Sequence, residues 1–479
     1  MQLDPSILRK YIERRTNDFA EFCAAATESE EYYHNQTSIV KNGATALQVV
    51  GAYLRLLGED PLHSADNRIP LNWHRILTDQ KLGYLFTYAP QFTVADNEDK
   101  DVAEALGDDF SKVLKRLGLD ASNAGMSWLH YWKDKSTGAL QYYYVDPKQI
   151  LPIYDETQLK KPLKYLIRSY RYEDSDGELY TRYELWDEKE VAYYRRKSAT
   201  DLSALAFEYL TNGEPKIEAH NFGKIPFIQF KNNDMFIPDL KMYKDIADNL
   251  DKVYSGFAND IDDIQEIIWV IKNYSGETGS VYKLDKNGDP ELDADGKPIM
   301  VENAPDILQR LKAHKYFTVD GDGGVDTIRG EIPYEARMRF IEALTKQLFI
   351  SAMAVDPNPN NTGNSSGVYI DFLYSLLELK AGLMEAGFRD GLNELVRVVL
   401  GLSEDTKIIQ TWSRNKPRND SEIVAMLSQT PDSIMSAESK TKVHPLVEDW
   451  QEERKVIEEE TEKHIPPYPG TLEDEAEDE

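Results

Sequence analysis

The chain has a single cysteine, Cys23, so it cannot form an intrachain disulfide. Its 8 histidines are scattered without the spacing of a metal-ligand pair. No stretch approaches the roughly 20 apolar residues that a membrane-spanning helix needs, and residues 1–6 lack the features of a signal peptide. From these absences we expect a soluble intracellular protein that binds no cofactor.

Signature sequences of common enzymes are also missing. The chain has no P-loop, no Gly-x-Gly-x-x-Gly turn, no Gly-x-Ser-x-Gly motif and no His-Glu-x-x-His motif. Basic residues are scarce relative to acidic ones: 55 Lys and Arg face 84 Asp and Glu, which gives a formal net charge of −29. Ordinary nucleic-acid binding needs a basic surface, so this balance argues against it.

What the chain does contain is enough apolar material for packed cores. Hydrophobic residues make up 41% of its 479 residues, and 28 Tyr with 7 Trp argue against global disorder. This length predicts two to four structural units. Residues 464–479 are strongly acidic and are expected to form a disordered tail. Such a tail serves solubility or docks a basic partner.

The first half of the chain changes from helical to strand patterns. Apolar residues recur at helical spacing in the first 60 residues, in 67–92 and in 102–119. Short aromatic and β-branched runs then follow, separated by turn signals. These predicted strands are 127–132, 140–145, 150–154, 165–172, 179–187, 191–195 and 226–230. Residues 1–235 are therefore predicted to form an α+β domain.

The second half contains two long helix patterns around a small insert. Asp239–Lys272 carries one narrow apolar stripe, and acidic residues, Asp239 among them, occupy the opposite face. The insert, 273–330, has mixed character. Its predicted elements are a strand at 281–284, a short helix at 303–312 and a strand pair at 316–319 and 325–328. Ile332–Val355 is the predicted partner helix. A break at Asp356-Pro357 leads into an uncharged Asn/Ser/Thr/Gly loop, and a third helix pattern with three glycines covers Val368–Leu402. Three shorter helices are expected at 420–429, 436–444 and 447–463.

One segment of the insert approaches a calcium-binding motif. Glu291, Asp293, Asp295, Gly296 and Glu302 reproduce the spacing of an EF-hand loop, with Glu at the first position in place of Asp. Asp and Gly also favour turns without any metal, and the flanking residues do not have helix patterns. The pattern favours a turn, and Asp293, Asp295 and Glu302 are the alternative metal ligands.

Several segments, in this order, resemble the portal proteins of tailed bacteriophages with long non-contractile tails. The resemblance covers nearly the whole chain. The segments are Asn67–Phe86, Val145–Pro147 with Ile150–Tyr154, Phe222–Asn233, Ser366–Lys380 and Trp412–Asp420. None of them is a catalytic signature. Their joint order, together with the helix–insert–helix–loop block, is what makes the resemblance specific.

The resemblance implies a mostly helical α+β subunit of a ring, usually of twelve copies. The implied parts are a wing (1–235), a first stem helix (236–272), a clip (273–330), a second stem helix (331–355), a tunnel loop (356–367), a tunnel-side helix of the wing (368–402) and a crown (403–463), followed by the tail 464–479.

The resemblance also implies a structural role, without catalysis, at one vertex of the capsid in the virion, and in the host cytoplasm during assembly. The implied partners are the terminase large subunit at the clip, adaptor and head-completion proteins, major capsid and scaffolding proteins, and double-stranded DNA passing without sequence specificity. No membrane contact is implied. A carboxylate-based hydrolase and a calcium-binding interaction protein remain the alternatives.

Two sets of residues are the expected DNA-facing positions of such a channel. The first set is the uncharged loop, which contacts phosphates through hydrogen bonds only. Its residues are Asn358, Asn360, Asn361, Thr362, Asn364, Ser365 and Ser366. The second set is Lys241, Lys244 and Lys252 in the first stem helix. These lysines either line the channel or pair with nearby acids.

Overall fold

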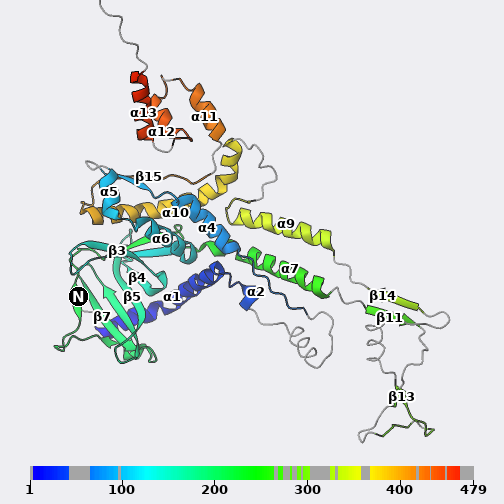
Figure 1. Ribbon diagram of the computed structural model, residues 1–479. Coiled ribbons are helices and arrows are strands. Elements are labelled where there is room, and N and C mark those ends of the chain that lie inside the picture. The colour runs from blue at the N-terminus through cyan, green and yellow to red at the C-terminus, as the bar shows by residue number, and fades with distance from the viewer. Residues whose placement is uncertain are drawn as a thin grey trace, which may run out of the picture. The chain divides into compact units, whose positions relative to one another are not determined.

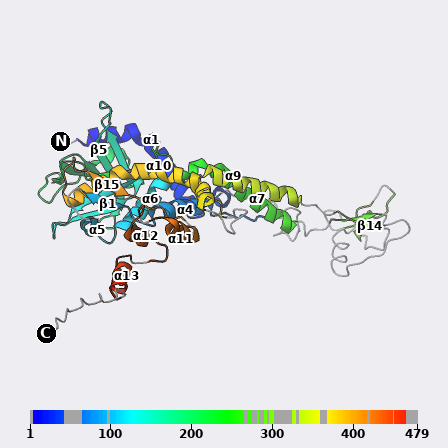
Figure 2. The same ribbon diagram turned by 90° about the horizontal axis from the view of Figure 1, so that it is seen from above.

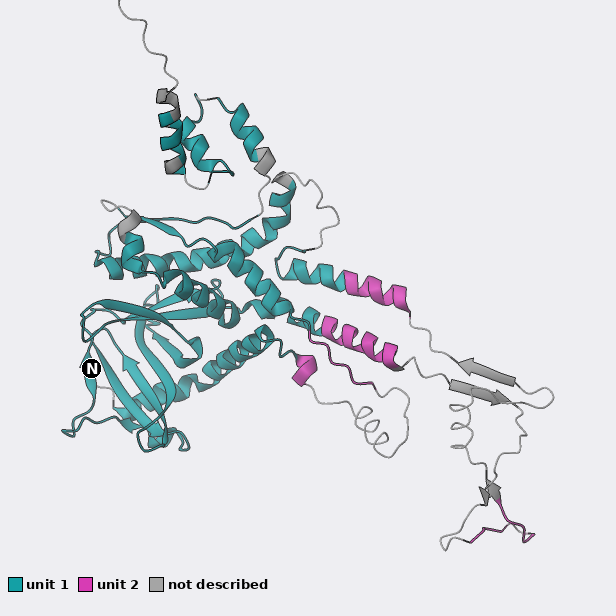
Figure 3. Cartoon of the chain, in the orientation of Figure 1, with its two compact units in different colours: residues 1–37, 71–248, 343–479 teal, residues 38–70, 249–342 magenta. Residues whose placement is uncertain are grey.

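The computed structural model describes residues 4–41, 65–94, 99–263, 268–272, 281–282, 289–292, 295–301, 324–328, 333–357, 367–416, 420–431, 433–447 and 450–463 (Figure 1). The chain divides into two compact units, shown in Figure 3. The first unit comprises residues 1–37, 71–248 and 343–479, and the second comprises 38–70 and 249–342.

Helices and strands together confirm the predicted α+β class. The helices are α1 Pro5–Tyr33, α2 Ser38–Lys41, α4 Trp73–Phe86, α5 Asp99–Leu106, α6 Phe110–Ala124, α7 Lys244–Asp263, α9 Tyr334–Ser351, α10 Gly367–Leu400, α11 Asp420–Gln429, α12 Ala437–Val443 and α13 Trp450–Lys463, with 3-10 turns η1 Pro147–Gln149, η2 Leu202–Ala204 and η3 Asp239–Met242. The strands are β1 Gln91–Val94, β2 Met126–Lys133, β3 Leu140–Val145, β4 Ile150–Tyr154, β5 Leu163–Glu173, β6 Leu179–Trp186, β7 Glu190–Lys197, β8 Ala206–Phe207, β9 Ile217–Ala219, β10 Phe227–Lys231, β11 Ile268–Lys272, β12 Val281–Tyr282, β13 Met300–Val301, β14 Gly324–Ile328 and β15 Ile408–Thr411.

The largest sheet of the first unit is antiparallel, with the order β4–β5–β6–β7–β8 and with β9 paired to β7. Successive side chains of a strand point to opposite faces. On one face Ile167, Leu185 and Tyr194 are buried and share a hydrophobic cluster with Leu8 of α1. This sheet and α1 therefore form one α/β layer pair, as the change from helical to strand patterns predicted.

A second core joins a three-stranded sheet, β10–β2–β3, to α4, α6 and α10. Helix α10 packs against β10 and α4. Figure 2 labels α10 and α4 in the same part of the molecule. Two glycines of α10 permit its close approach to β10. A Cβ at Gly387 would lie 2.4 Å from the backbone oxygen of Lys231, and one at Gly391 would lie 2.7 Å from the ring of Phe230. The α10 glycines predict bends. Helix α10 continues without a break over 34 residues, and its ribbon bends along its length (Figure 1).

The predicted helix over 102–119 is two helices. Helix α5 ends at Leu106, and α6 begins at Phe110. Between them Gly107 has a φ of +76°, and its N–H donates to the carbonyl of Ala103, as in a left-handed helix C-cap. Glycine adopts this conformation without a Cβ penalty, so it ends the helix.

In the second unit, α7 and α9 contact each other. Arg337 forms an ion pair with Asp260, and the rings of Phe257 and Tyr334 have centroids 6.1 Å apart. The prediction that these two helices are partners is confirmed for this stretch. The division between the units falls inside both helices.

The prediction of one helix from Asp239 to Lys272 is wrong at both ends. The segment begins with the 3-10 turn η3, and α7 ends at Asp263. Residues Ile268–Lys272 form strand β11, which pairs with β14. The run Ile-Trp-Val-Ile is β-branched and aromatic, so it prefers an extended backbone over a helix interior. The apolar spacing that suggested a helix there is compatible with both the helical period of about 3.6 residues and the strand period of about 2.

In and next to the expected clip, the described residues form the antiparallel pairs β11–β14 and β12–β13. Strand β11 precedes residue 273 and so lies in the segment predicted as the first stem helix. Strand β14 confirms the prediction at 325–328. The partner predicted for it, 316–319, lies outside the described residues, as do the predicted helices at 46–57 and 303–312 and the tail 464–479. Within the described part of the chain, no helix is long and apolar enough to cross a membrane.

Candidate functional site

The predicted tunnel loop itself lies outside the described residues. This holds for Asn358, Asn360, Asn361, Thr362, Asn364, Ser365 and Ser366. The structure does describe how the chain enters this segment from α9. We therefore built the candidate site from the residues that precede the loop and from the elements that hold them.

Helix α9 ends four residues before its predicted end, Val355, in a turn that reverses the backbone. The N–H of Ala354 donates to the carbonyl of Phe349 (3.0 Å), and the N–H of Met353 donates to the carbonyl of Ile350 (3.1 Å). This pattern is a Schellman motif, which requires a left-handed residue after the helix. Met353 takes that position with a φ of +51°.

Residues 352–355 after the helix are held by two side chains from other helices. Gln80 of α4 donates to the carbonyl of Val355 (2.8 Å) and accepts from its N–H (3.0 Å). Lys380 of α10 donates to the carbonyl of Ala352 (3.0 Å). Ala352, Ala354 and Val355 are buried. These hydrogen bonds thus hold in place the residues that precede the predicted loop.

Lys380 also belongs to a buried ionic cluster. Its Nζ lies 3.3 Å from Oδ2 of Asp239, at the start of η3, and Nζ of Lys81 lies 2.6 Å from the same oxygen. Asn232 accepts from Lys81 (2.8 Å) and donates to Oδ1 of Asp239 (2.9 Å). All four side chains are buried. We call Lys81, Asn232, Asp239 and Lys380 the junction cluster.

In the junction cluster, burial and neighbouring charges act in opposite directions on the pKa values of Asp239 and Lys81. Burial alone would raise the pKa of Asp239, but the positive charges of Lys380 and Lys81 and the hydrogen bond from Asn232 outweigh it and lower that pKa. Burial lowers the pKa of Lys81 to about 8, against the opposing pull of Asp239. The cluster thus places two lysines around one carboxylate.

A second buried chain of hydrogen bonds continues from the cluster. Tyr243 follows η3, and its hydroxyl lies 2.7 Å from Nδ1 of His74, whose Nε2 lies 2.9 Å from Oδ1 of Asn123. Burial lowers the pKa of His74 to about 4, so its ring is neutral at pH 7. Because the Asn123 oxygen only accepts, Nε2 carries the proton and Nδ1 accepts from Tyr243.

The sequence patterns do not predict that the residues of the junction cluster are buried together. Asp239 is expected on the solvent-facing side of the first stem helix, but only 2% of it is exposed. It lies in the 3-10 turn before α7, where the helical spacing does not apply. Lys81 and Lys380 sit in amphipathic patterns that place lysine at the surface. Only the tertiary structure brings them to one carboxylate.

The three predicted channel lysines differ. Lys244 lies 3.3 Å from a carboxylate oxygen of Glu28 and 3.4 Å from one of Asp248, so its charge is already partnered. Lys241 and Lys252 are exposed. Lys244 therefore has acidic partners within the chain, and a channel-facing position of the three lysines stays a prediction.

The calcium-like segment contains a turn where its residues are described. The N–H of Ile299 donates to the carbonyl of Glu291 (2.8 Å), Leu292 and Pro298 form an antiparallel bridge, and Gly296 has a φ of +79°. Of the candidate ligands, Asp295 lies in this turn, while Asp293 and Glu302 lie outside the described residues. No cluster of three metal-ligating side chains occurs among the described residues.

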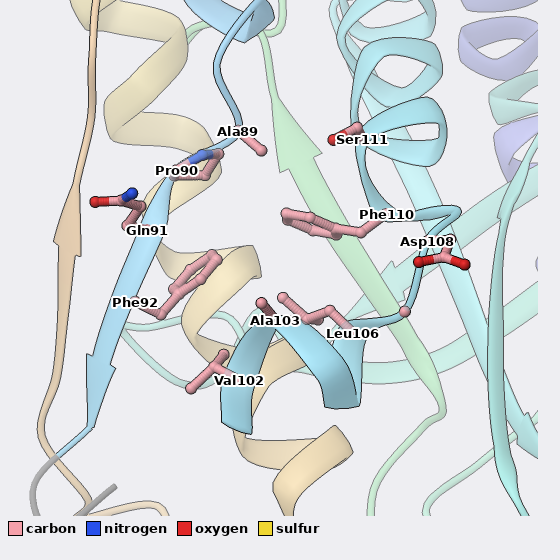
Figure 4. A pocket seen from close by; sticks show the side chains of 11 residues that line it. Ala89, Pro90, Gln91, Phe92, Val102, Ala103, Leu106, Asp108, Phe110 and Ser111 are labelled. Carbon is pink, nitrogen blue, oxygen red and sulfur yellow. The ribbon is translucent and has the colours of Figure 1, made fainter. Parts of the chain in front are cut away.

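One cavity of the first unit, with a volume of about 470 Å³, opens between β1 and the α5–α6 connection (Figure 4). The rings of Phe92 and Phe110 and the side chains of Val102 and Leu106 line it. Asp108 is the one titratable side chain among its lining residues.

Comparison with known proteins identifies the family. A profile described as "Phage portal protein, SPP1 Gp6-like" matches residues 12–467. This chain belongs to that portal family. The portal protein of Clostridium phage phiCD119 is 33% identical over 455 residues, covering 90% of this chain and 92% of that protein. The portal protein of Bacillus phage SPP1 is 30% identical over 466 residues, covering 93% and 86%.

A solved chain from the neck of an empty GTA particle aligns with 75% of this portal-family chain and 86% of its own length. The identity is 10% and the TM-score 0.42. The sequence relatives, which are matched almost end to end, therefore carry the family assignment.

Proposed function

We propose that this portal-family chain assembles into a ring that forms the channel for double-stranded DNA at one vertex of the capsid. DNA would enter through it during packaging and leave through it during ejection. The observation that carries the proposal is the family match across residues 12–467. It includes every element described above except the first residues of α1, so the proposal concerns the whole subunit.

The observed elements suit the parts of such a subunit. The stem would be α7 and α9, and the clip would be the strand pairs β11–β14 and β12–β13 between them. The crown would be α11, α12 and α13. The tunnel loop would follow Val355 and lead into α10. In this assignment the junction cluster lies where the stem meets the wing.

Exposed apolar side chains favour self-association. Helix α10 buries one face in the core of the first unit, yet Phe372, Leu376, Leu379 and Leu383 recur at spacings of four, three and four on an exposed face. Phe372 is 74% exposed and Leu379 61% exposed. A helix that is apolar on two sides normally buries both. Neighbouring subunits of a ring would cover this second face.

The charge balance suits a channel that DNA must slide through. Each phosphate neutralised by Lys or Arg strengthens DNA binding through counterion release. A subunit with a net charge of −29 and an uncharged loop at the constriction avoids holding its cargo. The exposed Lys241 and Lys252 would add only weak positive rings.

The proposed partners follow from the same assignment. The terminase large subunit would dock at the clip during packaging, and adaptor and head-completion proteins would replace it there. Major capsid and scaffolding proteins would contact the wing. The proposed site is the virion, at the portal vertex of the capsid, and the host cytoplasm during assembly. We propose no catalytic role.

Negative-stain electron microscopy of the purified full chain, combined with native mass measurement, tests the proposal. We expect rings with a central hole and roughly twelve subunits, stable across salt concentration. A homogeneous compact monomer at all concentrations would refute ring assembly. The test variant is Phe372→Glu with Leu379→Glu, compared with the wild-type chain. It places charges on the exposed face of α10 and should weaken assembly without unfolding the subunit.

A further inference from the structure

Lys380 links two segments that are far apart in the sequence. Its single ammonium group contacts Asp239, which begins η3 ahead of α7 (3.3 Å), and the carbonyl of Ala352, which follows α9 (3.0 Å). Both contacts are buried, and Lys380 itself is 5% exposed. The start of one long helix and the end of another therefore share one side chain.

This link is stiff for an electrostatic reason. A buried charge that loses its partner cannot be solvated by water. Removing one member of a buried ionic cluster therefore destabilises the fold far more than removing an exposed ion pair. Asp239 is held by Lys81 and Asn232 as well as by Lys380. A displacement of Asp239 would thus leave two buried ammonium groups without their counter-charge.

We propose that Lys380 is a positioning residue that couples the start of α7 to the turn that ends α9. Gln80 fixes Val355 on the same turn from α4. A shift of Asp239 would change the charge state or the position of Lys380, and through it the hydrogen bond to Ala352. The coupling holds for the isolated chain. Its role in the channel, relaying the state of the stem to the chain entering the tunnel loop, rests on the proposed function.

A second route between the segments exists and has to be separated from the first. Lys81 and Gln80 are neighbours in α4, and one touches Asp239 while the other holds Val355. If α4 carried the coupling, Lys380 would be dispensable. The two routes predict different results when Asp239 is changed in a chain that already lacks the Lys380 ammonium group.

Hydrogen–deuterium exchange of the purified full chain separates them. Asp239→Asn keeps the size of the side chain and the acceptor oxygen for Asn232, but it leaves Lys380 without a counter-charge. Lys380 must then lose its proton or leave the site, and either change weakens its bond to Ala352. We expect exchange of the peptide 348–357 to rise by about tenfold, the size typical of groups in one ionic network.

The same substitution in a Lys380→Met background should add nothing further at 348–357. The matched control is Lys224→Met, which removes an ion pair between Lys224 and Glu394 of the same α10 (2.8 Å) and should leave both 348–357 and 239–248 unchanged. The proposal is refuted if Asp239→Asn raises exchange only at 239–248. It is also refuted if 348–357 responds equally with and without Lys380, because α4 would then be the route.

Two further measurements keep the outcomes distinct. If Asp239→Asn does not fold, Lys380→Met is the deciding variant, because Asp239 keeps Lys81 and Asn232. It should raise exchange at 348–357, and an unchanged rate there would refute the coupling. Negative-stain images of the same samples test ring assembly separately. Coupling without rings would overturn the proposed function alone, and rings without coupling would overturn this inference alone.

Discussion

At the scale of single residues, the notable feature is how much polarity the structure buries around the start of α7. Lys81, Asp239 and Lys380 are buried together, and His74 and Tyr243 lie next to them in the same interior. A buried polar network that satisfies all its members fixes one arrangement, because any other leaves a charge or donor unpaired. Met353 adds a second local cost, a left-handed backbone on a residue with a Cβ. Met353 and the Lys380 contact to Ala352 both belong to the segment that precedes the predicted loop.

His74 gives a pH dependence that can be tested directly. Its pKa falls from 6.5 in the unfolded chain to about 4 in the folded one. Between these values the unfolded chain binds a proton that the folded chain does not, so stability falls as the pH falls. His74→Gln can still accept from Tyr243 and donate to Asn123. We expect its unfolding free energy to lose less than that of the wild type between pH 6.5 and 4, by up to about 3 kcal/mol.

Urea unfolding at several pH values measures this difference. The wild type and His74→Gln should have similar stability at pH 7.5 and should diverge only below pH 6.5. The control is His444→Gln, since His444 follows α12 and belongs neither to the junction cluster nor to the hydrogen bonds of His74. Parallel curves for the wild type and His74→Gln over the whole range would show that His74 is not the group that titrates.

At the scale of elements, local patterns were predicted well and long-range pairings poorly. Strands β3 and β4 and helix α11 have the predicted bounds, because alternation, helical spacing and turn residues are all local signals. Strand β15 was missed. It pairs with β1 from far earlier in the chain, as Gln91 opposite Thr411 shows. The residues of strand β11 were predicted as helix, because the helical spacing of their apolar side chains was given more weight than their β-branched composition.

Alanine substitutions in α10 test whether its glycines are needed for close packing or for helix bending. Gly387→Ala would place a Cβ against the Lys231 carbonyl, which cannot move away easily, so we expect a loss of about 1–3 kcal/mol in unfolding free energy. A Cβ at Gly382 would meet no atom within 4 Å. Gly382→Ala should therefore gain about 1 kcal/mol from helix propensity alone.

Chemical denaturation of both variants decides between the explanations. Opposite signs for Gly387→Ala and Gly382→Ala would confirm that glycine is needed at 387 for the contact with β10. If both substitutions destabilise the chain to the same extent, the glycines serve the helix backbone itself, and the contact with Lys231 is tolerant.

At the scale of the whole molecule, three independent features agree. The family match spans residues 12–467, and the order of α7, strand pairs, α9 and α10 follows the predicted block. Apolar side chains on one face of α10 are exposed, as the proposed ring assembly expects. The uncharged loop can be located from the sequence because its composition is a local signal, and its DNA-facing role stays a prediction. The junction cluster cannot be located in this way, since its residues come from four separate segments.

The loop prediction is tested by adding charge to it. Asn360→Glu with Asn361→Glu would place two carboxylates per subunit in the proposed constriction, repeated by the ring symmetry, where repulsion of DNA phosphates is concentrated. We expect normal rings but reduced packaging or retention of DNA in assembled particles. The control, Asn360→Gln with Asn361→Gln, is larger but uncharged, so it should package normally if charge is the cause. Packaging at the wild-type level by the Glu variant, in particles that contain the ring, would mean that this loop does not approach DNA.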